Sequence, residues 1–86
     1  MRVTLISPDR SVYDGEATSV IATAYDGEVG ILPHHAPFMT LLGDGRLVVR
    51  TGGVVQQFKV RGGFLQVRDN VVRLVTEHAE EDTYAR

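Results

Sequence analysis

Hydrophobic and polar residues alternate in short segments along the chain. In residues 64–68, for example, Leu65 and Val67 would face one side of a strand while Gln66 and Arg68 would face the other. Such segments are rich in Val, Ile, Thr, Phe or Tyr and are bounded by Gly, Asp, Asn or Pro. Alternation with a period of two between turn-forming residues is typical of β-strands. The pattern therefore predicts an all-β domain rather than one built from βαβ units.

The turn-forming residues divide the chain into about eight to ten short strands. Gly52-Gly53 and Asp69-Asn70 predict tight hairpins. Gly62-Gly63 predicts a bend or a close approach of the backbone, since glycine has no Cβ. Asp26-Gly27 and Gly43-Asp44-Gly45 are predicted as further turns. The expected strands cover residues 2–7, 11–16, 17–24, 28–32, 38–42, 46–51, 54–61, 64–68 and 71–76.

Some of these strands carry apolar residues on both faces. Val72 and Leu74 alternate with Val71 and Val75, so neither face of this strand is fully polar. A strand of this kind either lies between two sheets or keeps one face for a partner. Many short strands with turns every 8–12 residues are characteristic of a sandwich or a small barrel.

The last ten residues differ from the rest of the chain. Segment 77–86 is acidic, has little apolar content and could form barely two turns of helix. Isolated helices shorter than about 12–15 residues are marginal in water. We therefore divide the chain into a β domain, residues 1–76, and an acidic C-terminal tail or stub of a missing element, residues 77–86.

Composition and charge narrow the class of function. The chain has 86 residues, of which 43% are hydrophobic, so there is room for one packed core. Its formal net charge of −2 argues against a nucleic-acid partner, because phosphate binding needs a basic face. The sequence has no cysteine, no signal-peptide-like start and no apolar run long enough to cross a bilayer. The cytoplasm is therefore the expected compartment.

No group of residues matches a catalytic or metal-binding motif. His34 and His35 are adjacent, and in extended backbone they would point to opposite sides, so they would not chelate one ion together. No serine lies in a nucleophile elbow, and there is no cysteine nucleophile. Gly43-Asp44-Gly45 lacks the third glycine of a dinucleotide-binding loop. We expect a protein that is not an enzyme and that uses no metal or cofactor.

Segment 26–42 resembles the signature of the epsilon subunit of F-type ATP synthases. That signature is an acidic turn followed by Gly-Glu, Gly-aliphatic, Leu-Pro, one further residue and His-Ala-Pro. Two other blocks resemble the family in the same order, residues 3–17 and residues 60–70, although Gln66 stands where an acidic residue is common. The matching residues of the signature are Gly27, Glu28, Gly30, Leu32, Pro33, His35, Ala36, Pro37, Leu41 and Leu42.

The resemblance implies a flattened two-sheet β-sandwich in the central rotor stalk of a proton-translocating ATP synthase. Such a subunit joins the gamma subunit to the c-subunit ring and couples ion flow to ATP synthesis. The expected location is peripheral, at the cytoplasmic face of the cell inner membrane. In the family, the Gly-Glu turn and the neighbouring histidine loop lie near the polar loops of the c-ring. This nominates Asp26, Gly27, Glu28 and His35 as partner-binding residues.

The C-terminus departs from the family. Most members carry a C-terminal pair of helices that can restrain ATP hydrolysis, and some bind ATP there through an aliphatic-Asp-x-x-Arg-Ala motif. The sequence stops at Arg86, where that hairpin would begin, and residues 82–86 have the wrong spacing for the motif. We therefore expect neither self-inhibition by the hairpin nor ATP binding by this motif. The start at Met1 favours a naturally short member over a truncated one.

Two alternatives from other classes of protein stay open at this point. One is a small ligand- or carbohydrate-binding sandwich with a site at the Pro-His-His-Ala-Pro loop, residues 33–37. It would need a concave pocket there, and the sequence has no tryptophan to serve as a sugar platform. The other is a small hydrolase, which would need a convergent nucleophile and base.

Overall fold

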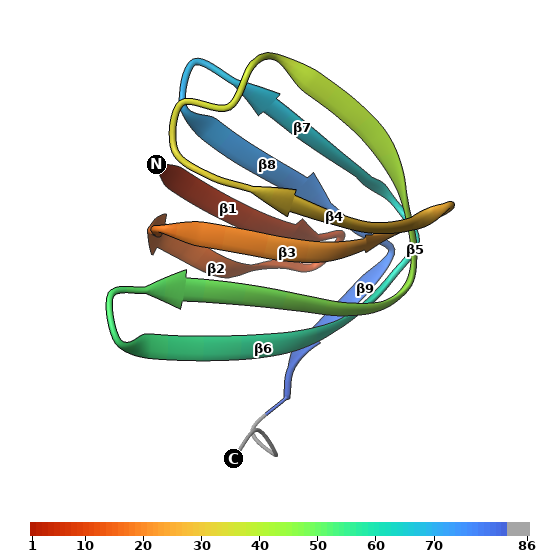
Figure 1. Cartoon of the computed structure of the whole chain (residues 1–86). Coiled ribbons are helices and arrows are strands. Elements are labelled where there is room, and N and C mark those ends of the chain that lie inside the picture. The colour runs from red at the N-terminus through yellow and green to blue at the C-terminus, as the bar shows by residue number, and fades with distance from the viewer. Residues whose placement is uncertain (83–86) are drawn as a thin grey trace.

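Buried and exposed positions alternate along the strands of the computed structural model, which describes residues 1–82. In the first strand, for example, Val3, Leu5 and Ser7 are buried. The residues described contain no helix, and so none that could cross a membrane. Figure 1 shows the nine strands of residues 1–82: β1 (Arg2–Ser7), β2 (Arg10–Glu16), β3 (Ser19–Ala24), β4 (Gly27–Ile31), β5 (Phe38–Thr51), β6 (Val54–Arg61), β7 (Phe64–Arg68), β8 (Val71–Val75) and β9 (His78–Glu81).

The strands form two sheets that share β5. One sheet has the order β2-β1-β8-β7 and ends with residues 38–41 of β5. In the other, residues 42–51 of β5 lie between β3 and β6, with β4 and β9 at the outer edges. Only the β1–β8 pair is parallel among the pairings of residues 1–82. This arrangement confirms the predicted all-β sandwich.

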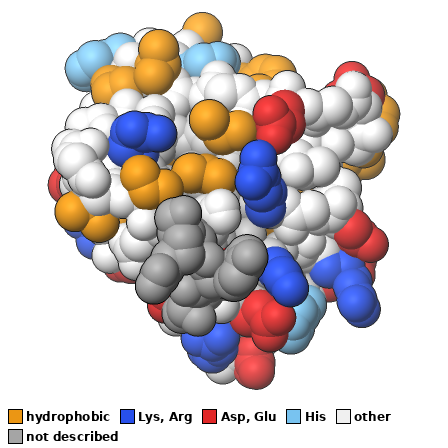
Figure 2. Space-filling view, turned by 60° about the horizontal axis from the view of Figure 1, so that its bottom comes forward, with side chains coloured by type: hydrophobic (Ala, Val, Ile, Leu, Met, Phe, Trp, Pro, Cys, Tyr) orange, Lys and Arg blue, Asp and Glu red, His pale blue; other side chains and the backbone are white. Residues whose placement is uncertain are grey.

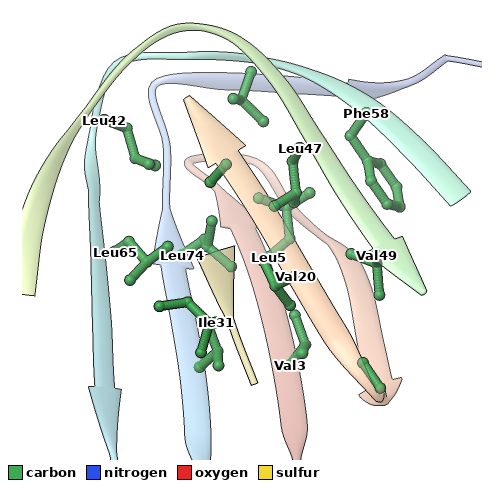
Figure 3. Close-up of a cluster of buried hydrophobic side chains, with 14 of the residues drawn as sticks. Val3, Leu5, Val20, Ile31, Leu42, Leu47, Val49, Phe58, Leu65 and Leu74 are labelled. Atoms are coloured by element: carbon green, nitrogen blue, oxygen red, sulfur yellow. The ribbon is translucent and has the colours of Figure 1, made fainter. Parts of the chain in front are cut away.

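The apolar faces of the two sheets meet in one core. Leu5, Leu65 and Leu74 come from the first sheet, and Leu47 and Phe58 come from the second (Figure 3). All five side chains are at most 1% exposed. The whole cluster comprises Val3, Leu5, Ala17, Val20, Ala22, Ile31, Leu42, Leu47, Val49, Phe58, Val60, Leu65, Val67, Val72, Leu74 and Ala79.

The predicted turn at Gly43-Asp44-Gly45 is wrong, because β5 runs through it without a break. The pairing of β3 with β5 shifts register between Ala22 and Ala24, so β5 bends here and passes from one sheet to the other (Figure 1). A Cβ added to Gly45 would lie 2.5 Å from Thr23 Oγ1. The glycine therefore allows the bent strand to pass close to β3.

The C-terminal tail was predicted to begin at residue 77, but His78–Glu81 forms β9 and pairs with β6. Ala79 lies opposite Val60 and is only 4% exposed. The free edge of β6 offers unpaired backbone groups, and a small apolar residue in β9 faces the core. Strand pairing thus outweighs the acidic composition of this segment. The rest of the predicted tail, residues 83–86, lies outside the described residues.

Most of the predicted hairpins occur where the turn residues indicated them. Asp69 and Asn70 adopt φ angles of 52° and 63°, and Gly52 has a φ of 61°. These left-handed angles are those that two-residue hairpin loops require. The hairpin between β3 and β4 is displaced by one residue, since Tyr25 and Asp26 form its loop and Gly27 is the first residue of β4.

Candidate functional site

Three of the four predicted partner-binding residues lie together at the β3–β4 hairpin. Asp26, Gly27 and Glu28 are all exposed, and Ala24 pairs with Gly27 across the hairpin. Gly27 has a φ of 137°, an angle that L-residues rarely adopt, and no atom lies within 4 Å of where its Cβ would be. Glycine is needed here for its backbone angle, which turns the chain and projects the two carboxylates into solvent.

Neither carboxylate of this hairpin is paired with another of the residues that the structure describes. The ion pairs of residues 1–82 join Met1 with Glu16, Arg2 with Asp14, Arg68 with Asp69, and His78 with Glu80. Within residues 1–82, the side chains of Asp26 and Glu28 form no hydrogen bond or ion pair. Both carboxylates are therefore available to basic or amide groups of another molecule.

An exposed apolar strip lies beside the hairpin. Tyr25, Met39 and Leu41 are 68%, 59% and 62% exposed. The backbone N–H of Tyr25 donates a hydrogen bond of 3.1 Å to the carbonyl oxygen of Leu41, so the hairpin loop is attached to β5. These residues and Thr40 line an open hollow of about 320 Å³. We call Tyr25, Met39 and Leu41 the β5 strip, after the strand that contains Met39 and Leu41; Tyr25 itself belongs to the β3–β4 loop.

The fourth predicted residue, His35, lies elsewhere. It belongs to the loop of residues 32–37, which follows β4, whereas Asp26–Glu28 precedes and begins β4. The five residues of β4 span roughly 15 Å, and Figure 1 shows the hairpin and the loop at opposite ends of the sandwich. The structure therefore divides the predicted site into two, the 26–28 turn and the histidine loop.

Local contacts hold the histidine loop. The backbone N–H of His35 donates to the carbonyl oxygen of Leu32 over 3.2 Å, and that of His34 donates to Asn70 Oδ1 over 2.8 Å. The imidazole of His35 packs edge-on against Phe38, with ring centroids 5.7 Å apart. His34 has a φ of 65°, so the backbone at this residue is not extended, contrary to the expectation from the sequence.

The hollow next to this loop is not lined by its histidines. An open hollow of about 560 Å³ is bordered by Pro37, Phe38, Met39, Gln66, Val67 and Arg68. His34 is exposed and His35 is half-buried, and neither lines it. No cluster of three or more His, Cys, Asp or Glu side chains within residues 1–82 could hold a metal ion. Within the described residues, the histidine loop borders this hollow only through Pro37.

Two features of the surface were not predicted from the sequence. The β5 strip was not foreseen, because Met39 and Leu41 lie in an apolar run that also suits a buried strand. The second is a hollow of about 570 Å³ on the outer face of β5, β6 and β9. Acidic and basic side chains lie interspersed there (Figure 2). Its charged lining consists of Asp44, Arg46, Lys59, Arg61, His78, Glu80 and Asp82. With both signs of charge present, it is not a basic surface for nucleic acid.

Comparisons with known proteins agree with this fold. The family described as the β-sandwich domain of the ATP synthase delta/epsilon chain matches residues 1–82. The ATP synthase epsilon chain of Leptospira borgpetersenii is 41% identical over 78 residues, which cover 91% of this chain and 61% of that protein. The epsilon chain of Caulobacter vibrioides is 36% identical over 81 residues, 94% of each chain.

Solved structures agree as well. A chain of the mitochondrial ATP synthase of Euglena gracilis superimposes with a TM-score of 0.85 at 30% identity, over 92% of this chain and 51% of that one. A chain from the central stalk and c-ring of the Tetrahymena thermophila enzyme has a TM-score of 0.80 at 21% identity and supports the fold. This chain spans about three fifths of the length of the Leptospira relative. By sequence and by fold, it belongs to the family of ATP synthase delta/epsilon chains and contains their β-sandwich domain.

Proposed function

We propose that this chain is a non-catalytic rotor subunit of a proton-translocating F-type ATP synthase. It joins the gamma subunit to the c-ring and couples proton flow to ATP synthesis, peripherally at the cytoplasmic face of the cell inner membrane. Membership of the delta/epsilon family supports this role. So does the match at 30% identity to a chain from a structure described as containing F1 and the c-ring.

The observation that carries the proposal is the juxtaposition of the β5 strip with two carboxylates that have no partner in the described part of the chain. Tyr25, Met39 and Leu41 expose apolar surface that the core does not use, and Asp26 and Glu28 lie beside it. Exposed apolar residues next to polar ones are typical of protein-docking surfaces. Because the strip and the turn lie on paired strands of a rigid sandwich, a partner bound there would move with the whole domain.

The two kinds of surface fit two kinds of partner. We assign the acidic 26–28 turn to the polar loops of the c-ring, where carboxylates would accept hydrogen bonds from amide or basic groups. The apolar β5 strip is assigned to the gamma subunit. His35, at the opposite end of β4, cannot join the 26–28 turn in one compact contact, so we assign the histidine loop to gamma as well.

The non-catalytic part of the proposal agrees with the nature of the site. Its two carboxylates, on Asp26 and Glu28, are exposed on a turn and have no partner among residues 1–82, whereas a general acid or base needs a neighbour that positions it. The ligand-binding alternative gains no support from the loop at residues 33–37, whose histidines do not line the neighbouring hollow. We therefore do not assign the chain a substrate.

Titration of this chain onto the purified gamma subunit of the same synthase tests the assignment. We expect a complex with a Kd at or below micromolar concentration. Replacing Met39 and Leu41 together by Ser should weaken it by at least about a hundredfold, since each buried side chain contributes about 1.5–3 kcal/mol. Val54→Ser is the matched control, because Val54 is 61% exposed but lies at the β5–β6 hairpin, away from the strip.

The absence of a complex with gamma, or equal weakening by the strip and control variants, would count against this function. A second measurement addresses coupling. Addition of the chain to a synthase depleted of its epsilon subunit should restore proton-coupled ATP synthesis, and the Met39→Ser/Leu41→Ser variant should restore less at the same concentration.

A further inference from the structure

Asn70 connects three segments that are distant in the sequence. Its side-chain Oδ1 accepts a hydrogen bond of 2.8 Å from the backbone N–H of His34. Its backbone carbonyl accepts one of 3.1 Å from the N–H of Arg2, at the start of β1. Asn70 itself lies in the tight turn between β7 and β8. The histidine loop is thereby fastened to a turn that belongs to the first sheet.

The fastened residue has an unfavourable backbone conformation. His34 has a φ of 65°, a left-handed angle that costs free energy for a residue with a Cβ. The hydrogen bond that its N–H donates to Asn70 in this conformation offsets part of this cost. Asn70 has a φ of 63°, an angle that asparagine tolerates better than most residues. Loop and turn thus hold one another.

The next residue of the loop, His35, has one ring nitrogen engaged. Its Nδ1 lies 2.7 Å from the carbonyl oxygen of Ala36. A carbonyl oxygen only accepts hydrogen bonds, so Nδ1 must carry the hydrogen and donate. In the neutral ring, Nε2 is then a hydrogen-bond acceptor. Within residues 1–82 no hydrogen bond to Nε2 is formed, and the edge-on contact with Phe38 fixes the orientation of the ring.

We infer that Asn70 is a positioning residue, which holds the histidine loop so that Nε2 of His35 accepts a hydrogen bond from the partner. The donor on the partner is an amide, guanidinium or ammonium group. This inference deepens the proposed function and rests on it, since it takes the gamma subunit as the molecule that the histidine loop contacts. It adds a residue, Asn70, that lies outside the family signature in segment 26–42.

The positioning role is tested on this chain alone. Asn70→Gly removes the acceptor but allows the left-handed φ, whereas Asn70→Asp keeps an oxygen in the same place. We expect hydrogen exchange of the His34 amide to accelerate about tenfold in Asn70→Gly and to stay within about twofold in Asn70→Asp. Asp69→Gly is the matched control, since Asp69 lies in the same turn, with a φ of 52°, and forms no hydrogen bond with the loop.

Nitrogen-15 NMR of the His35 ring tests the second step. We expect the neutral ring of the wild-type chain to carry its hydrogen on Nδ1. A neutral ring with its hydrogen on Nε2 would overturn the inference. So would a His34 amide that exchanges equally fast in Asn70→Gly and in the wild type. Amides of the buried strands, measured in the same samples, show whether a variant has lost stability as a whole.

The affinity of the variants for the gamma subunit tests whether the histidine loop contacts this partner. His35→Phe keeps a ring against Phe38 but has no acceptor, and we expect it and Asn70→Gly each to raise the Kd about tenfold. Asn70→Asp and Asp69→Gly should leave the Kd within about twofold. Unchanged affinity in His35→Phe would overturn the partner contact. If the wild-type chain does not bind gamma, the proposed function fails with it, and the exchange data still decide whether Asn70 holds the loop.

Discussion

Gly63 lies so close to Val75 that a Cβ on the glycine would overlap the carbonyl oxygen of Val75. Gly63 has a φ of 99°, and its own carbonyl oxygen accepts a hydrogen bond of 2.9 Å from the N–H of Leu42. The glycine therefore fits between β5 and the end of β8, at the point where the chain passes from β6 in one sheet to β7 in the other. This is the close approach predicted for Gly62-Gly63.

Gly63→Ala should destabilise the domain by about 3 kcal/mol, because the methyl group meets backbone that cannot move without disturbing two sheets. Gly53→Ala is the control, since no atom lies within 4 Å of its Cβ position, and its effect should stay within about 0.5 kcal/mol. Chemical unfolding monitored by circular dichroism measures both. Similar midpoints for the two variants would show that the chain relaxes around the added methyl group.

Phe58→Ala should cost about 3–5 kcal/mol, the range for removing a buried aromatic ring. Phe58 is 1% exposed, and its ring packs edge-on against Tyr13 at 5.7 Å. A domain of this size is stable by only about 4–13 kcal/mol, so the variant should lose a large share of its stability and unfold at a clearly lower temperature. Thermal unfolding checks this, with Val54→Ala, at a residue 61% exposed, as the control. A loss below about 1 kcal/mol for Phe58→Ala would mean that the core refills the space.

The elements that could be predicted from the sequence are those specified by local signals. The β7–β8 hairpin is the clearest case, because alternating apolar residues flank Asp69-Asn70, two residues that tolerate left-handed angles. The elements that were missed depend on distant residues. Gly43-Asp44-Gly45 has the composition of a turn, and only its contacts with Thr23 and Ala24 make it a bend within a strand.

For the candidate site too, local features could be predicted from the sequence and the relationships between distant residues could not. The turn at Asp26-Gly27 was predicted from local residues to within one position, whereas its role in partner binding was implied only by the resemblance and stays a prediction. The distance between this turn and His35 was not predicted, because the six residues between Glu28 and His35 can fold back or extend, and here the first of them continue β4. The contact of Asn70 with His34 joins residues 36 positions apart, so no local pattern could have indicated it.

Ser7→Ala should raise the pKa of Asp9 toward its ordinary value. The Ser7 hydroxyl donates a hydrogen bond of 2.9 Å to Asp9 Oδ1, and this bond is the main reason why the pKa of Asp9 is lowered. Because the folded-state pKa is the lower one, the carboxylate stabilises the fold above its ordinary pKa, and this contribution is lost as the pH falls through the lowered pKa. NMR titration of Asp9 measures the shift, with Ser11→Ala as the control. An unchanged Asp9 titration in Ser7→Ala would assign the lowering to the backbone instead.

Ala79→Asp should destabilise the domain by roughly 3 kcal/mol, because it places an unpaired carboxylate where the side chain is only 4% exposed. His78→Asp introduces the same group on the exposed side of β9 and should cost less than about 1 kcal/mol. Chemical unfolding of both variants compares them directly. Equally small effects would indicate that β9 is not docked on β6 in solution and that the acidic segment behaves as the predicted tail.

Asp26→Asn combined with Glu28→Gln should weaken attachment to the c-ring while leaving the free energy of unfolding within about 0.5 kcal/mol. The physical reason is that neither carboxylate has a partner within the described chain, so the fold does not depend on their charge. Proton-coupled ATP synthesis in a reconstituted enzyme should fall, and the difference from the wild type should shrink at high salt, which screens exposed charges. Glu81→Gln, an exposed carboxylate on β9, should leave coupling unchanged. If the double variant instead loses stability and couples normally once folded, the 26–28 turn serves only to shape the hairpin.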